Sequence, residues 1–140
     1  MADVELISCA IADADRRVLL AHRSDHNQWQ LLGGRVLYGE SPFDAIQRQV
    51  TKAVKADVTR QRYMAGTVFT QGGAEYACQW WQGHINQEPE LVDTERYDEI
   101  AYFNLYKRDI ARVGLSPNVE RFAEALQHGE IHLIPSNLVQ

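Results

Sequence analysis

The chain has 140 residues, of which 45% are hydrophobic and 24% charged, so it can bury one apolar core and is expected to form a single domain over residues 1–140. Its formal net charge of −5 argues against nucleic acid as the main partner, because phosphate backbones attract basic surfaces. The acidic N-terminus and the short apolar runs favour neither a signal peptide nor a membrane span, so we expect a cytoplasmic protein.

The first third of the chain predicts three extended segments. Residues 4–12 and 18–22 are rich in apolar and β-branched side chains and flank a charged turn, a pattern typical of a β-hairpin. A polar loop follows, and a short extended run at 29–32 leads into Gly33 and Gly34. Two consecutive glycines indicate a backbone that turns tightly or approaches another group closely.

A helix is predicted to begin after Ser41. The Ser41 side chain can accept hydrogen bonds from free N–H groups of the first turn, and Pro42 suits the first helical position. Apolar side chains then recur at spacings of three and four residues, so one face of the helix is expected to pack against a core. These side chains belong to Phe43, Ile46, Val50 and Val54.

The second half of the chain alternates between extended and helical patterns. We expect strands at 63–70 and 75–85 joined by a glycine turn, a polar loop at 86–98, a strand at 100–103, a short helix at 105–113 and a helix at 117–127. Cys9 and Cys78 each fall within an expected strand, which favours buried free thiols over a disulfide. The order of elements predicts an α/β fold, with a mixed β-sheet and helices packed against it.

The segment from Gly34 to Arg48 has a characteristic spacing. Glu40 follows Gly34 after five residues, and Arg48 follows Glu40 after seven more. The segment resembles the first half of the Nudix box, Gly-x5-Glu-x7-Arg-Glu-U-x-Glu-Glu-x-Gly-U, in which U is a bulky apolar residue. The runs WQLLGG at 29–34 and DEIAYF at 98–103 are also similar to sequences of this family. The resemblance implies the Nudix fold and, as in that family, metal-dependent hydrolysis of diphosphates.

The second half of the box departs from the family pattern. The three helix glutamates are replaced by Gln49, Lys52 and Ala53, and the closing glycine is replaced by Lys55. Positions 49, 52 and 53 share one helical face because they are spaced i, i+3 and i+4. In the family, carboxylates at these positions bind Mg²⁺ or Mn²⁺, which require oxygen ligands. One amide, one ammonium and one methyl group cannot replace them, so we expect no metal cofactor.

Three functional interpretations stay open. In the first, the chain binds a nucleoside diphosphate-linked or similar anionic metabolite but has lost the usual hydrolysis. Cationic side chains would then neutralise the diphosphate in place of the metal. The expected binding residues are Gly33, Gly34, Arg35, Arg48 and Lys52.

In the second interpretation, the chain is a divergent hydrolase of nucleoside diphosphate derivatives such as nucleotide sugars. Glu40 would then be the catalytic residue, and Glu40 and Glu99 would hold Mg²⁺ or Mn²⁺. Arg48 is placed to pair with either Glu40 or Asp44, the latter four residues away on the helix. The alternative is that Glu40 is a structural carboxylate near the start of the helix, where the helix dipole favours a negative charge.

In the third interpretation, the chain is a partner-binding or structural module that forms a homodimer. Exposed aromatic side chains often mark interfaces, and Trp80, Trp81 or the tail at 131–138 could supply one. The sequence does not identify the ligand, and it does not decide whether the chain is an enzyme.

Overall fold

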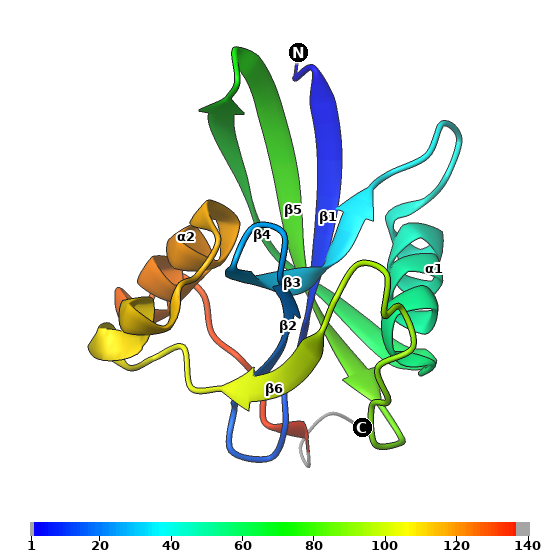
Figure 1. The fold of residues 1–140 in the computed structure, drawn as a ribbon, viewed down its shortest axis with the longest axis vertical. Coiled ribbons are helices and arrows are strands. Elements are labelled where there is room, and N and C mark those ends of the chain that lie inside the picture. Colours follow the sequence, from blue (N-terminus) through cyan, green and yellow to red (C-terminus); the bar gives the residue numbers. More distant parts are fainter. Residues whose placement is uncertain (1, 137–140) are drawn as a thin grey trace.

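A computed structural model describes residues 2–136 of the chain. Its elements are β1 (Val4–Ile11), β2 (Val18–Arg23), β3 (Gln28–Arg35), α1 (Pro42–Val54), β4 (Val58–Gln71), β5 (Ala74–Ile85), β6 (Glu99–Phe103), the 3₁₀ helix η1 (Arg108–Val113) and α2 (Pro117–Gln127). The strands form one sheet in the order β4-β5-β1-β3-β2-β6, with α1 and α2 on opposite sides of it (Figure 1). Because β1 and β5 are parallel and the other pairs antiparallel, the predicted mixed-sheet α/β fold is confirmed.

The first two strands do not form the β-hairpin that the sequence predicts. Strand β3 lies between them and is antiparallel to both, with its first half on β2 and its second half on β1. Between β1 and β2 themselves, the described residues form an isolated bridge from Ala12 to Val18. The prediction was wrong because neighbouring apolar runs indicate strands without fixing which strand each one pairs with.

The two consecutive glycines lie within β3, where the chain packs closely against its neighbours. Gly33 has a φ of 149°, and a Cβ there would collide with the carbonyl oxygen of Ile7 and lie 2.9 Å from Cα of Ser8. At Gly34, a Cβ would lie 2.6 Å from Nε2 of Gln49 on α1. The expected close approach is confirmed, since these glycines let both β1 and α1 pack directly on β3.

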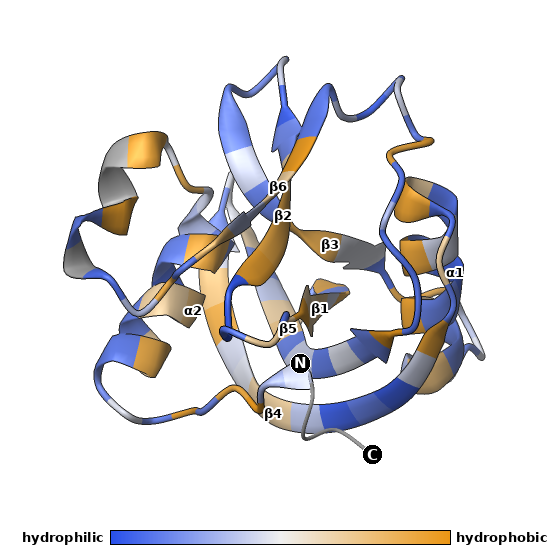
Figure 2. Ribbon diagram, turned by 90° about the horizontal axis from the view of Figure 1, so that it is seen from below, coloured by the Kyte–Doolittle hydropathy of each residue, from blue (hydrophilic) through white to orange (hydrophobic). Residues whose placement is uncertain are grey.

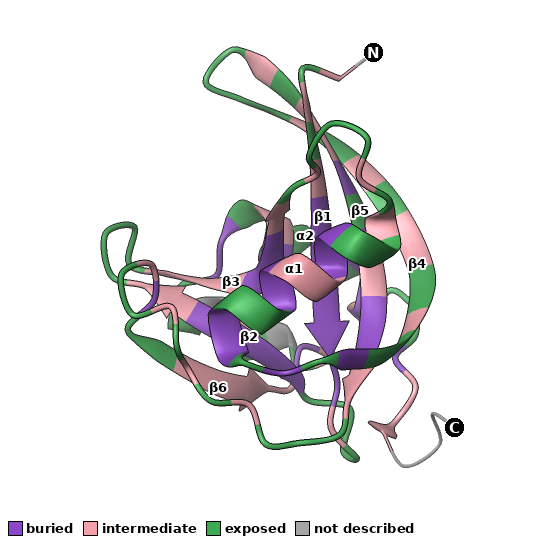
Figure 3. Cartoon of the chain, turned by 90° about the vertical axis from the view of Figure 1, so that its right-hand side faces the viewer, coloured by how far each residue is buried: buried purple, intermediate pink, exposed green. Residues whose placement is uncertain are grey.

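Helix α1 begins at Pro42, as predicted. The N–H of Asp44 donates to Oγ of Ser41 at 3.1 Å, which caps the first turn. Figure 3 shows buried, intermediate and exposed residues following one another along α1. Its buried residues are Ala45, Ile46, Gln49, Val50, Ala53 and Val54. Phe43 is 52% exposed, contrary to expectation, because it lies in the first turn at the margin of this buried face.

Lys55 ends α1 in a backbone conformation that favours glycine. Its φ is 51° and its ψ is 44°, in the left-handed region, where a side chain is strained by roughly 1 kcal/mol. We therefore expect Lys55→Gly to raise the free energy of unfolding in urea by about 0.5 kcal/mol or more. As a control, Lys52→Gly in the helix interior should lower it by about 1 kcal/mol. A loss of stability in Lys55→Gly would contradict this view of the helix end.

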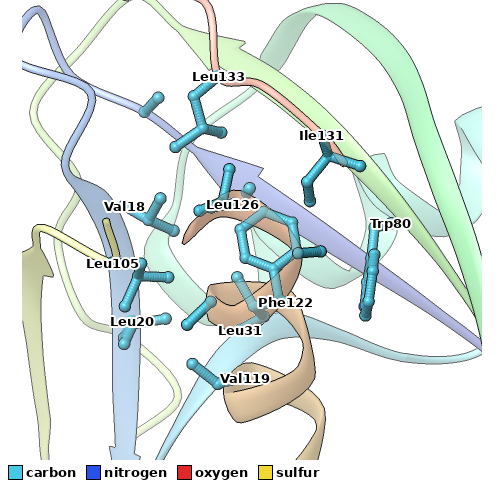
Figure 4. Close-up of a cluster of buried hydrophobic side chains, with 14 of the residues drawn as sticks. Val18, Leu20, Leu31, Trp80, Leu105, Val119, Phe122, Leu126, Ile131 and Leu133 are labelled. Atoms are coloured by element: carbon cyan, nitrogen blue, oxygen red, sulfur yellow. The ribbon is translucent and has the colours of Figure 1, made fainter. Parts of the chain in front are cut away.

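The apolar core has two parts, one on each face of the sheet. On the α2 side, Trp80 and Phe122 pack edge to face with ring centroids 5.3 Å apart, surrounded by aliphatic side chains (Figure 4). On the α1 side, the cluster includes Ile46 and Tyr97. Both helices carry apolar residues interspersed with polar ones (Figure 2). Each helix thus has one apolar face to bury and one polar face for solvent.

Burial removes most of the dimer surface expected from the sequence. Trp80 is 5% exposed, and Ile131 and Leu133 are also buried, because all three pack in the cluster on the α2 side. Trp81 is only partly buried. The rest of the expected tail surface, from residue 137 onward, lies outside the described residues. Within the described part of the chain, no helix has the length and apolar content to span a membrane.

Candidate functional site

A cleft of about 240 Å³ opens beside the glycines of β3. Its floor includes Ser8 from β1 together with Gly33 and Gly34, and its walls include Phe69 from β4 and Asn118 from the first turn of α2. The close packing of β3 on β1 therefore forms the floor. The C-terminal end of β4 and the N-terminal end of α2 contribute to the walls.

The other end of the cleft is cationic. Arg23, at the end of β2, lines it together with His26 and with Arg96 from the loop before β6. Arg23 is paired with Asp25 through two hydrogen bonds, from Nε at 3.1 Å and from Nη2 at 2.7 Å. The guanidinium carbon of Arg96 lies 5.1 Å from the centroid of the Tyr97 ring. No carboxylate side chain of a described residue lines this cleft, but Asp25 neutralises Arg23, so Arg96 is the arginine at this end that the described residues leave without an ion pair.

A chain of hydrogen bonds fixes the floor of the cleft. Nε1 of Trp80 donates to Oδ1 of Asn118 at 3.0 Å, and Nδ2 of Asn118 donates to Oγ of Ser8 at 3.0 Å. Oγ of Ser8 lies 3.4 Å from Sγ of Cys78. Burial raises the pKa of the Cys78 thiol to about 11, so the thiol stays protonated and is no nucleophile at neutral pH. The floor is therefore polar, uncharged and firmly positioned.

Glu40 and Arg48 hold the loop after β3 against α1. Nε of Arg48 donates to Oε2 of Glu40 at 2.8 Å, and Nη2 donates to Oε1 at 3.0 Å and to the carbonyl of Arg35 at 3.0 Å. Oε1 also accepts from the N–H of Leu37 at 3.0 Å. Arg48 therefore pairs with Glu40 and not with Asp44.

The same contacts define the chemistry of Glu40. Its hydrogen bonds to Arg48, and then to the N–H of Leu37, lower its pKa to about 2. A carboxylate with so low a pKa is a poor proton acceptor at neutral pH. Both of its oxygens already accept hydrogen bonds from Arg48, so Glu40 links the loop after β3 to α1.

Two of the three positions that carry helix glutamates in the Nudix box are buried, whereas the third, Lys52, is exposed. Gln49 is 9% exposed and packs against Gly34, while Ala53 is 5% exposed. The carbonyl of Ala53 accepts from the N–H groups of Val92 and Asp93, so the loop before β6 lies on this end of α1. Among the described residues, no group of three His, Cys, Asp or Glu side chains is arranged to hold a metal ion. One buried amide and a methyl group do not fit Mg²⁺.

The structure does not bring Glu99 to Glu40. Glu99 begins β6 and lies opposite His22 of β2, which in turn lies opposite Trp29 at the start of β3. Glu40 follows the far end of β3, about 20 Å along the strand at ~3.3 Å per residue. The two carboxylates are therefore placed at different ends of the sheet and do not form a common metal site.

His22 joins β2 to two neighbouring segments. Its Nδ1 lies 2.8 Å from Oδ1 of Asp98, and its Nε2 lies 3.2 Å from Oδ1 of Asn27. The hydrogen bond to Asp98, followed by the one to Asn27, raises the pKa of His22 above its ordinary value. The protonated ring can donate to both oxygens, whereas the neutral ring can donate to one.

The pH dependence of stability follows from this raised pKa. The stabilisation by His22 is fully present below its unfolded pKa of about 6.5 and is lost as the pH rises through the higher folded value. We expect the wild type to exceed His22→Gln in free energy of unfolding at pH 5.5, with the difference shrinking by pH 8.5. The change should stay below about 1 kcal/mol, since Asp98 is half-exposed. Urea denaturation at both pH values would measure it, and a difference that grows with pH would contradict the assignment.

A family model described as a NUDIX domain matches residues 5–107. The chain belongs to the Nudix family. The matched range includes Gly34, Glu40 and Arg48, whose spacing resembles the first half of the Nudix box. A comparison with curated proteins finds no significant match.

Solved structures of Nudix proteins share the fold. A MutT NUDIX hydrolase from Burkholderia pseudomallei is 20% identical with a TM-score of 0.76, over 88% of this chain and 97% of its own. A MutT protein from Methanosarcina mazei is 18% identical with a TM-score of 0.75, over 91% and 94% of the two chains. A UDP-X diphosphatase is 15% identical with a TM-score of 0.67, over 93% of this chain and 65% of its own. At these identities, the likeness shows the Nudix fold.

The cleft contains part of the binding set expected from the sequence. Gly33 and Gly34 line it, whereas Arg35, Arg48 and Lys52 do not. The sequence analysis missed Arg23 and Arg96, which do line it. Two signals in this Nudix sequence could have identified them: Arg23 follows an apolar strand directly, and Arg96 is a cation within an acidic loop.

Proposed function

We propose that this Nudix protein binds a nucleoside diphosphate-linked or similar anionic metabolite through arginine side chains, without the Mg²⁺-dependent hydrolysis typical of its family. The observation that carries the proposal is the composition of the cleft, in which Arg23 and Arg96 meet at one end and no carboxylate of a described residue takes part. The name of one solved relative, UDP-X diphosphatase, supports a nucleotide diphosphate as the class of ligand.

Two arginines can take over the electrostatic part of a metal's role. Arg96 supplies one positive charge, and Arg23 supplies a second where a phosphate replaces Asp25 as its partner. A guanidinium can donate two parallel hydrogen bonds to phosphate oxygens. Gly33 and Gly34 at the floor carry no side chains, so a bulky anionic group can approach the backbone. Arginine side chains do not supply the activated water that a bound metal would provide, which agrees with binding rather than hydrolysis.

The opposite end of the cleft favours a ligand with a ring. Leu6, Phe69 and Pro117 offer apolar surface there, and Asn118 offers a polar group at its edge. A nucleobase has a flat apolar face and a polar edge, so it matches this end better than a free phosphate does. The cleft thus suits a nucleoside at the Phe69 end with its phosphates at the arginine end.

A thermal-shift screen in EDTA tests this proposal. The panel contains ADP-ribose, UDP-glucose and nucleoside triphosphates, and at least one of them should stabilise the protein, by about 2.7 kcal/mol at a hundredfold excess over its Kd. The same compounds incubated with Mg²⁺ or Mn²⁺ should yield no phosphate or nucleotide product. Stabilisation by none of them, or metal-dependent product release, would contradict the proposal.

A further inference from the structure

Asp25 binds the guanidinium of Arg23 at the cationic end of the cleft. Its Oδ1 accepts from Nε of Arg23 at 3.1 Å and its Oδ2 accepts from Nη2 at 2.7 Å, which makes a pair of parallel hydrogen bonds. Nε2 of His26, which also lines the cleft, lies 3.8 Å from the same Oδ2. Asp25 itself does not line the cleft. Its carboxylate therefore occupies, from outside the cleft, hydrogen-bond donors that a phosphate would use.

The carboxylate of Asp25 can leave Arg23 without disturbing the loop that carries it. Asp25 lies between β2 and β3, and its side chain is 59% exposed, whereas that of Arg23 is 25% exposed. Asn27 closes this loop, because its N–H donates to the carbonyl of Ser24 at 3.3 Å and its Oδ1 lies 3.2 Å from Nε2 of His22. Rotation of Asp25 into water breaks neither contact, and exposed ion pairs contribute little to stability.

The two arginines of the cleft differ in what an incoming anion finds. The ion pairs formed by the described residues include Arg23 but not Arg96. A single phosphate can therefore bind Arg96 and leave the pair of Arg23 with Asp25 intact. A diphosphate bound to Arg96 brings its second phosphate to the same end of the cleft, at an effective concentration far above that of a free anion. The second phosphate is thus the better competitor for Arg23.

We propose that Asp25 is a specificity-determining residue of the cleft, whose carboxylate withholds Arg23 from single anions and yields it to the second phosphate of a diphosphate that Arg96 already holds. This inference rests on the proposed function and narrows its class of ligand to anions with two linked phosphates. The carboxylate of Asp25 and the second phosphate compete for the same guanidinium, so removing the carboxylate strengthens the binding of a diphosphate.

Asp25→Asn tests the inference by calorimetry in EDTA, with inorganic pyrophosphate and inorganic phosphate as the two probes. Asparagine keeps the shape of the side chain and removes its charge. We expect the variant to bind pyrophosphate about fivefold more tightly than the wild type does, which corresponds to the loss of one exposed ion pair. Its affinity for inorganic phosphate should change by about twofold or less, because Arg96 holds a single phosphate in both proteins.

Asp15→Asn is the matched control. Asp15 is likewise an exposed aspartate in a turn, and it neither lines the cleft nor takes part in an ion pair formed by the described residues. Its replacement removes the same charge and should leave both affinities unchanged. Equal gains in the two variants would mean that net charge governs binding, which would overturn the role of Asp25.

The other outcomes separate this inference from the proposed function. Equal or weaker binding of pyrophosphate by Asp25→Asn would overturn the inference and leave anion binding intact, since Asp25 would then not compete with the ligand for Arg23. An equal gain with inorganic phosphate would also overturn it, because Asp25 would then repel every anion alike. No binding of pyrophosphate by either protein would overturn both the inference and the proposed function.

Discussion

Replacing both Arg23 and Arg96 with glutamine should weaken binding of a nucleoside diphosphate ligand about a hundredfold. Each charge-assisted hydrogen bond to a phosphate contributes about 1.5–3 kcal/mol, and about 1.4 kcal/mol corresponds to a factor of ten in Kd. Each single substitution should therefore raise the Kd about tenfold. Calorimetry in EDTA, with the best ligand from the thermal-shift screen, measures the three values.

The control removes the same charge outside the cleft. Arg60 and Lys107 are both exposed and do not line it, so Arg60→Gln/Lys107→Gln should bind as the wild type does. Equal losses in the two double variants would mean that net charge, and not the cleft, governs binding. No loss in the Arg23→Gln/Arg96→Gln variant would remove these arginines from the site.

Restoring one family glutamate by Ala53→Glu should lower the free energy of unfolding by about 3 kcal/mol or more. Ala53 is 5% exposed, and the loop carrying Val92 and Asp93 lies on it. A carboxylate introduced there would be buried without a cationic partner, or it would displace the loop. Urea denaturation without divalent metal measures the loss.

Lys52→Glu is the matched control, because Lys52 is exposed on the same helix. It should cost about 1 kcal/mol or less, through the negative charge near the helix C-terminus. The triple variant Gln49→Glu/Lys52→Glu/Ala53→Glu should regain part of its stability when Mg²⁺ is added, since a ligand specific to the folded state stabilises it. A folded triple variant that does not respond to Mg²⁺ or Mn²⁺ would contradict the alignment of these positions with the Nudix box.

Local signals in the sequence correctly predicted the start of α1 and the close packing at the glycines of β3. Ser41 and Pro42 begin α1, and the close approach at Gly33 is confirmed, because caps and glycines act through neighbouring backbone atoms. The pairing of β1 with β2 was wrong because strand partners are chosen by the whole sheet. The expected burial of Phe43 was wrong, because helical periodicity identifies the apolar face of a helix but not how far along the helix the core covers that face.

The candidate site was harder to predict because it is assembled from distant segments. Arg23 ends β2 and Arg96 lies in the loop before β6, and they come together only because β2 and β6 are neighbours in the sheet. The covering of Ala53 likewise depends on a loop some forty residues further along the chain. In contrast, the absence of the three helix glutamates was visible in the sequence, and the structure buries two of those positions, Gln49 and Ala53, while Lys52 is exposed.

The central claim is that the protein recognises a diphosphate without a metal ion. Its most direct test is to titrate the wild type with the ligand that gives the largest thermal shift, once in EDTA and once in Mg²⁺. We predict a Kd that agrees within about threefold between the two titrations, because arginines and not a metal ion hold the anion. Binding that is absent in EDTA and appears only with Mg²⁺ would contradict this.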